Sequence, residues 1–153
     1  MNERPGRPTG AALLLAQVGA LGSRLFADRI APLGLTSAQS GLLRAIAGEP
    51  GRSQNELAAE LGVRPSRLVV LVDELEDGGL VQRDRDPDDR RRHVLQLTPR
   101  GRATWFRLVG SAADHEAQLC AALSIEERRQ LAGLLQRIAE EHGLPSAVPT
   151  SRA

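Results

Sequence analysis

Apolar residues recur along most of this chain at helical spacing. Between about Gly10 and Ile30, leucine and valine fall at intervals of three and four, which predicts a helix with Thr9 as its cap. Further apolar residues widen the stripe beyond one face of this helix. A helix that is apolar on more than one side needs two partners.

Three shorter helices follow, and each has its own start signal. Capping boxes begin at Thr36 and Ser53, and Pro65 stands where the first position of a helix tolerates proline. Gly62 belongs to the turn before Pro65, and the helix that starts there continues to Asp77. The residues expected to form its buried face are Leu68, Leu71, Val72 and Leu75.

The stretch that ends at Thr98 changes to period two. Val81–Arg83 and His93–Leu97 are predicted as the strands of a β-hairpin, with Pro87 in a turn rich in arginine and aspartate. Such a hairpin rarely folds alone, so neighbouring helices must supply its core. Two short helices joined by a glycine-containing turn and followed by a hairpin predict a winged helix-turn-helix.

Two longer helices complete the chain. Thr98 is expected to cap one that runs to about Leu123, and a third capping box at Ser124 opens another that stops at Gly143. Packing the apolar end helices together and against a second copy is the simplest way to bury them, which predicts a two-fold dimer. The apolar stripe of the helix that Thr98 caps is expected to contain Ala103, Phe106, Ala113, Ala117 and Cys120.

The predicted fold class is therefore mainly α with a small β-hairpin wing, a winged helix-turn-helix whose long terminal helices form a dimerisation region. We expect a disordered N-terminal arm over 1–8 and a flexible tail over 144–153. The segments 9–31 and 99–143 are expected to form the helical dimerisation region, and 34–98 the DNA-binding region.

Composition narrows the classes of function. The 153 residues suit about one domain, no run approaches the roughly 20 apolar residues of a membrane span, and the first nine residues lack a secretory signal, so we expect a cytoplasmic protein. All 20 basic residues are arginine, which suits bidentate contacts to phosphate and guanine, although a coding bias gives the same count. Aromatic residues make up only 2%, which argues against stacking on single-stranded nucleic acid.

Catalytic and metal-binding patterns are missing from the sequence. It has no GxSxG, HExxH, CxxC or phosphate-loop motif, and its three histidines do not approach metal-ligand spacing. We therefore expect neither an enzyme nor a metal or cofactor site. The single cysteine, Cys120, excludes an internal disulfide bond and is expected to pack on an apolar stripe.

Six short motifs cover about residues 35 to 101. They are Leu35-Thr36-x-x-Gln39, Glu56-Leu57-Ala58, Val72-Asp73-x-Leu75, Gly79-Leu80-Val81-x-Arg83, Pro87-x-Asp89-Arg90-Arg91 and Leu97-Thr98-x-x-Gly101. With these motifs the chain resembles the multiple-antibiotic-resistance regulator (MarR) family of bacterial transcription factors. The resemblance implies a homodimer whose recognition helices enter successive major grooves and whose wings reach the adjacent minor grooves. It also implies a small-molecule or redox signal that releases DNA.

Candidate DNA contacts lie on the recognition helix and just before it. Arg64 and Arg67 are candidates for guanine edges or phosphates, Ser66 for either, and Val70 for a thymine methyl group. Gln54, at the start of the preceding helix, is a candidate phosphate contact. The alternative is an ordinary solvated face, but an apolar side chain such as Val70 opposite the buried stripe requires a reason.

The recognition helix departs from the family at two positions. Position 70 is often arginine in the family and position 74 often basic, whereas this chain has Val70 and Glu74. Glu74 and Asp77 are expected to bring negative charge near the phosphates. The arginines of the wing are therefore expected to carry more of the affinity for DNA.

At the wing tip, Asp89 and Arg91 match a family pair in which the carboxylate orients an arginine that enters the minor groove. Arg90 is a further candidate contact. A narrow A·T minor groove concentrates negative potential, so a pre-oriented guanidinium suits it. The alternative is a salt-bridged turn without a ligand, because ten arginines and ten acidic residues cancel between Arg52 and Arg102.

An effector pocket, as the resemblance implies, lies between the dimerisation helices and the DNA-binding region. Its candidate lining residues, which are equally candidates for the core, are Phe26, Leu42, Ala45, Trp105 and Phe106. Ser40 stands where the family often has an aromatic residue, which argues against a phenolic ligand site taken over unchanged.

The expected function is sequence-specific regulation of transcription. A homodimer is predicted to bind a pseudo-palindromic double-stranded operator, as a repressor that responds to a small-molecule effector. The alternative is a winged-helix module that binds another protein and has little affinity for DNA, because the central region carries no net charge and has Val70 and Glu74 on its recognition helix.

Overall fold

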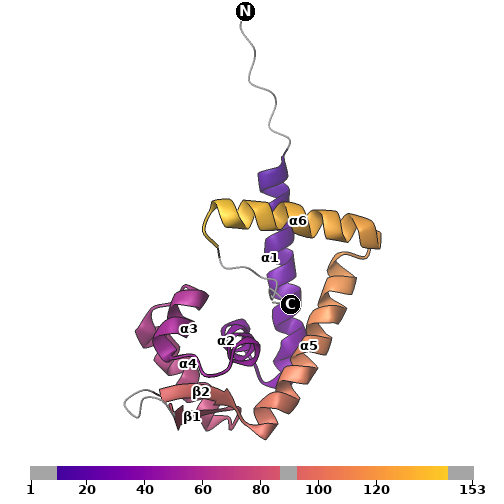
Figure 1. Ribbon diagram of the computed structural model, residues 1–153. Helices are drawn as coiled ribbons and strands as arrows, with labels where there is room; N and C mark the ends of the chain where they lie inside the picture. The colour runs from indigo at the N-terminus through magenta and orange to yellow at the C-terminus, as the bar shows by residue number, and fades with distance from the viewer. Residues whose placement is uncertain (1–9, 87–92, 145–153) are drawn as a thin grey trace, which may run out of the picture.

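The structure is a computed structural model in which residues 10–86 and 93–144 are described (Figure 1). Its elements are α1 (Ala11–Ile30), the 3₁₀ helix η1 (Ala31–Leu33), α2 (Ser37–Gly48), α3 (Gln54–Leu61), α4 (Pro65–Asp77), β1 (Val81–Arg85), β2 (His93–Leu97), α5 (Pro99–Leu119) and α6 (Ile125–Glu141). The predicted mainly α fold with a small β-hairpin is confirmed. The predicted arm, the wing tip and all but the first residue of the predicted tail lie outside the described residues.

One apolar core holds the central helices and the hairpin together. The four residues predicted as the buried face of α4 are at most 1% exposed, which confirms that prediction. They pack with Leu42, Leu43 and Ile46 of α2, Leu57 of α3 and Leu95 of β2. In Figure 1 these elements gather at one end of the molecule, and α6 lies at the other. The core therefore forms one compact module that presents α4 beside the hairpin.

Local hydrogen bonds begin most of the helices where the sequence predicts. Thr36, Ser53 and Ser124 each accept from the backbone N–H three residues later, and Gln39, Glu56 and Glu127 return the bond in three complete capping boxes. Each box satisfies backbone groups that a helix end leaves without a partner. These boundaries need only neighbouring residues, so they can be predicted without the tertiary structure.

The hairpin pairs antiparallel, with Val81 opposite Leu97 and Arg85 opposite His93 at the last described pair. Ser53 forms an isolated bridge to Val94, which ties the start of α3 to the second strand. Val81, Val94 and Leu95 are buried, so the base of the wing belongs to the core. The wing therefore leaves the module in a direction set by α3 and α4.

The Leu-Thr-x-x-Gly motif joins the hairpin to α5. The Thr98 hydroxyl donates to the Gly79 carbonyl at 2.7 Å and accepts from the Gly101 N–H at 2.9 Å. The Thr98 N–H donates to the Leu80 carbonyl at 3.1 Å. A Cβ atom at Gly101 would stand 1.9 Å from the Leu80 carbonyl oxygen, so only glycine permits this approach. The end of α4, the hairpin and α5 thus meet at one rigid junction.

Three details of the long helices correct the sequence-based predictions. α5 ends at Leu119 rather than about Leu123, because the chain must turn before Ser124 takes the extended conformation of a helix cap. Gly10, not Thr9, precedes α1 as its N-terminal cap. The predicted stripe of α5 is also wrong, since the helix rests on its neighbours through other positions. These are Gly101, Trp105, Leu108, His115 and Leu119, which are buried or half-buried.

The C-terminal half of α1 packs along α5. Arg29 donates to the Gln118 side chain at 2.5 Å, and the Phe26 ring lies 5.4 Å from that of His115. By length and composition, Ala11–Leu33 also suffices to cross a membrane, with a mean hydropathy of 1.2. The expectation that no stretch approaches such a span is therefore too strong. A helix that packs against protein passes the same test, and this packing accounts for one side of the C-terminal half of α1.

Candidate DNA-binding surface

The first half of α4 is open to solvent on the side away from the core. Ser66, Arg67 and Val70 are exposed, as their helical spacing predicts, and Arg64 is exposed at the cap position. α4 rests on α2, α3 and β1, so its remaining face is available. Residues near the start of a recognition helix are those that reach base edges in the major groove. The contact of these four residues with DNA stays a prediction.

Glu74, which the sequence places near the phosphates, is held by another helix. The Gln39 side chain donates to its carboxylate at 2.9 Å. Gln39 also completes the capping box of α2, since its side-chain oxygen accepts from the Thr36 N–H at 2.9 Å. The carboxylate therefore lies toward the start of α2, where the positive end of the helix dipole favours negative charge.

Two other acids of α4 form ion pairs with an arginine of the wing. Arg83 of β1 pairs with Asp73 through one guanidinium nitrogen and with Glu76 through another. The Arg83 backbone N–H also donates to Glu76 at 3.3 Å. Burial lowers the pKa of Arg83, but the hydrogen bonds and charges of Asp73 and Glu76 outweigh this effect and raise it. Arg83 therefore stays charged and fastens the wing to the recognition helix.

The other predicted contacts are placed unequally. Gln54 is half-buried at the first position of α3, next to the cap Ser53. Asp89, Arg90 and Arg91 lie outside the described residues, so the family pair at the wing tip stays a prediction. The described wing ends with Arg85 opposite His93, and both are exposed.

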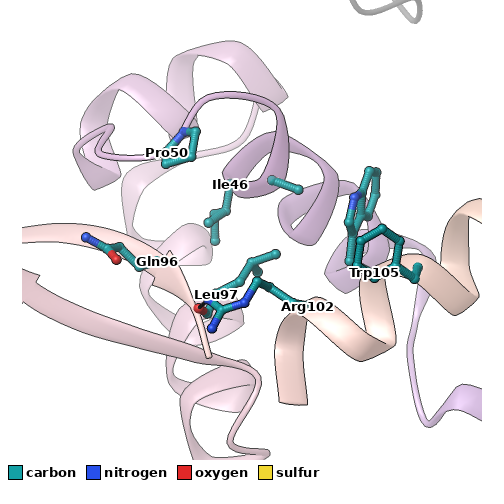
Figure 2. Close-up of a pocket in the computed structure, with 8 residues that line it drawn as sticks. Ile46, Pro50, Gln96, Leu97, Arg102 and Trp105 are labelled. Carbon is teal, nitrogen blue, oxygen red and sulfur yellow. Dashed lines mark hydrogen bonds between the residues drawn. The ribbon is translucent and has the colours of Figure 1, made fainter. Parts of the chain in front are cut away.

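A pocket of about 240 Å³ lies between the end of α2, β2 and the start of α5 (Figure 2). Its lining residues are Ile46, Ala47, Pro50, Gln96, Leu97, Arg102, Trp105 and Phe106. The Arg102 guanidinium donates to the Leu97 carbonyl at 2.7 Å, which holds the cation beside the pocket. The pocket thus combines apolar and aromatic walls with one positive charge.

Of the five residues predicted for an effector pocket, Trp105 and Phe106 line this one. Leu42 and Ala45 are buried in the core, and Phe26 packs on His115 instead. Arg102 was missed, although its spacing of three and four from Trp105 and Phe106 indicates a shared face of α5. Gln96 and Leu97 come from the hairpin, and no local pattern could have joined them to this group.

Among the described residues, no group of three histidine, cysteine, aspartate or glutamate side chains is placed to hold a metal ion. Cys120 is half-buried at the end of α5. The candidate sites among the described residues are the exposed face of α4 and the pocket beside Trp105.

Comparison with known proteins identifies the family. Residues 33–92 match the family model described as the MarR family. The chain is 40% identical over 105 residues to a protein named as a transcriptional regulatory protein for the hcr operon in Thauera aromatica. That alignment covers 69% of this chain and 63% of the relative, which is thus matched over less than two thirds of its length. The role named for this relative, regulation of transcription, is not an enzymatic one.

Two solved structures have the same fold over nearly their whole length. The transcriptional repressor CouR bound to a 23-mer DNA duplex is 37% identical, with a TM-score of 0.76, over 91% of this chain and 99% of that one. CouR from Rhodococcus jostii RHA1 bound to p-coumaroyl-CoA is 29% identical, with a TM-score of 0.76, over 92% and 96%. The chain belongs to the MarR family of winged-helix transcriptional regulators.

Proposed function

We propose that this protein is a cytoplasmic repressor that binds a pseudo-palindromic operator as a homodimer and releases it when a small molecule binds. The observation that carries the proposal is the exposed first half of α4. It presents Arg64, Ser66 and Arg67, while farther along the helix Asp73 pairs with Arg83 and Glu74 accepts a hydrogen bond from Gln39. In this arrangement, guanidinium and hydroxyl groups are the polar groups nearest to an approaching duplex. The proposed function involves no catalytic step.

Each exposed group has a defined role in this proposal. Arg64 and Arg67 contact guanine edges or phosphates, and Ser66 donates to either. Gln54 contacts a phosphate at the start of α3. Asp89, Arg90 and Arg91 act at the minor groove, a proposal that rests on sequence alone. The related repressor bound to a DNA duplex supports this use of the fold.

The dimer is supported by apolar surface that one chain leaves exposed. On α1 this surface comprises Leu13, Leu14, Leu15, Val18 and Leu21, and on α6 it comprises Ile125, Leu131, Leu134, Leu135 and Ile138. No residue of α6 is buried within the chain. An apolar surface of this extent is unusual in a monomer. A second copy related by a two-fold axis would cover it and would set two α4 helices about 34–36 Å apart.

The test is selection of bound fragments from random duplex DNA by the purified full-length protein. We expect inverted repeats whose half-site centres are about 10 base pairs apart, and binding that weakens steeply with salt. Sedimentation of the same preparation reports whether two copies bind each fragment. A dimer that retains no duplex even at low salt would instead favour the protein-interaction module.

For the effector, we propose a planar aromatic acid or the aromatic end of its thioester in the pocket beside Trp105. The volume of about 240 Å³ suits one ring with its acid group and is below the roughly 300–1,000 Å³ of sites for drug-sized ligands. Arg102 would pair with the carboxylate or thioester oxygen. The related complex with p-coumaroyl-CoA supports this class of ligand.

Trp105 is the single tryptophan of the chain, so its fluorescence reports directly on this pocket. We expect p-coumaroyl-CoA or p-coumaric acid to quench it and to lower affinity for the selected duplex at the same concentration. Quenching without any change in DNA binding would exclude the pocket from regulation.

A further inference from the structure

Two adjacent valines stand exposed on the recognition helix. Val69 is 41% exposed and Val70 44% exposed, although the helix buries four other apolar residues completely on its opposite side. β-Branched residues lower helix stability slightly, and these two valines leave more than two fifths of their surface exposed. The fold therefore does not account for the exposed part of these two side chains.

The proposed dimer does not account for them either. α4 makes its contacts with α2, α3 and β1, whereas the exposed apolar surface for a second copy lies on α1 and α6. Figure 1 shows α4 beside the hairpin and α6 at the other end of the molecule. The valine pair thus lies on the face that the proposed function assigns to DNA.

The surroundings of the pair favour a duplex as its occupant. Arg67 is exposed within one turn before Val70, and Ser66 lies one turn before it on the same side. On the following turn, Asp73 is paired with Arg83 and Glu74 with Gln39. An apolar spot with arginine before it, and with the charge of Asp73 offset by Arg83 after it, is compatible with a polyanion. It is a poor binding site for a purely apolar partner.

We propose that Val70, supported by Val69, reads the 5-methyl group of a thymine in the operator, so that this methyl group by itself contributes to specificity. The proposal rests on the proposed function. Thymine carries the one apolar group that a base pair presents in the major groove, whereas the other base-edge groups are hydrogen-bond donors and acceptors. A valine side chain has no polar atom, so the methyl group is the feature that it can recognise.

The test replaces thymine by deoxyuridine, one position at a time, in a duplex selected by the wild-type protein. This change removes the methyl group and leaves the base pairing intact. At one symmetry-related pair of positions we expect affinity to fall about fourfold per half-site, the equivalent of about 0.8 kcal/mol for one methyl-sized apolar group. 5-Bromodeoxyuridine at the same position should restore binding, because bromine is similar in size to a methyl group.

Val70→Ala identifies the side chain responsible. The variant should bind the thymine duplex about as weakly as wild type binds the deoxyuridine duplex, and it should show no further loss with deoxyuridine. Val69→Ala should reduce the methyl effect only in part. Both substitutions are at exposed helical positions, and unchanged circular dichroism and thermal unfolding would establish that the fold is intact.

The outcomes are distinct. If the protein binds a selected duplex with equal affinity for thymine and deoxyuridine at every position, the methyl reading is wrong while the proposed function stands. If Val70→Ala keeps the full methyl effect, another residue reads it and the assignment to Val70 is wrong. If no duplex is bound at all, the proposed function itself fails.

Discussion

At the scale of single residues, Gly101 is the described glycine at which an added side chain would meet the closest contact. Its Cα approaches the Leu80 carbonyl so closely that a methyl group would overlap the oxygen. The backbone on both sides is held by the hydrogen bonds of Thr98, so neither side can move away at low cost. The glycine of the Leu-Thr-x-x-Gly motif is therefore required for packing, independently of DNA contact.

We expect Gly101→Ala to lower the free energy of unfolding by about 3 kcal/mol, because overpacking against fixed backbone is costly. Urea unfolding followed by circular dichroism measures it. Gly110→Ala is the matched control, since it lies on the same helix with open space around its Cα. That variant should gain about 0.5–1 kcal/mol from the better helix propensity of alanine. Equal effects in the two variants would refute the close approach.

Arg83 is the second residue on which the arrangement of wing and recognition helix depends. Arg83→Gln leaves Asp73 and Glu76 as uncompensated negative charges on the recognition helix. We expect about 1–2 kcal/mol of lost stability, since the pair is partly exposed, and a loss of DNA affinity that is largest at low salt.

Fluorescence anisotropy with the selected duplex at several salt concentrations measures this effect. Adding Asp73→Asn and Glu76→Gln to the variant should recover most of the DNA affinity, because the repelling charges are gone. Arg107→Gln, an exposed arginine of α5, controls for the change in net charge. A triple variant as weak as Arg83→Gln alone would show that charge compensation is not the role of Arg83.

At the scale of elements, the capping boxes illustrate how local chemistry sets helix ends. Glu127 accepts from the Ser124 N–H at 2.7 Å, and this bond lowers the pKa of its carboxyl group below the usual value. A carboxyl group with a lowered pKa in the folded state stabilises that state above its unfolded pKa, and the contribution is lost as pH falls through the folded pKa. The start of α6 is therefore expected to loosen in acid.

Amide exchange of Ser124 and of the first turn of α6 should accelerate relative to the rest of the helix as pH falls below about 4.5, after correction for intrinsic rates. Glu127→Gln keeps an acceptor for the capping bond without a titrating group, so the acid-dependent loosening should disappear. If it persists in Glu127→Gln, another group is responsible.

At the scale of the whole molecule, α1 and α6 leave apolar faces exposed that the proposed dimer would bury. Leu134→Asp places a charge in the middle of the α6 face. We expect this variant to sediment as a monomer and to lose most of its affinity for the full operator, because only one recognition helix is then presented. Gly133→Asp adds the same charge where nothing lies within 4 Å of the new Cβ within the chain, and it should remain a dimer. If Leu134→Asp also remains a dimer, the interface lies elsewhere.

The sequence by itself determined the features that depend on neighbouring residues. The capping boxes follow from side chains three positions apart, and the buried face of α4 from the helical period of Leu68 to Leu75. The exposed positions of Ser66, Arg67 and Val70 follow from the same period. For these features, local hydrogen bonding and the burial of one helix face favour a single local conformation.

Only the tertiary structure decided which distant side chains meet. The bond from Gln39 to Glu74 joins residues on two helices, and Arg83 reaches Asp73 and Glu76 across the junction of wing and helix. The stripe of α5 and the pocket of Arg102 and Trp105 likewise depend on how α5 lies on α2 and β2. Such contacts arise from the docking of whole elements, and no short-range pattern encodes the distance and angle between two packed helices. The sequence therefore predicts that Glu74 faces DNA, whereas in the structure its carboxylate is hydrogen-bonded to Gln39 of α2.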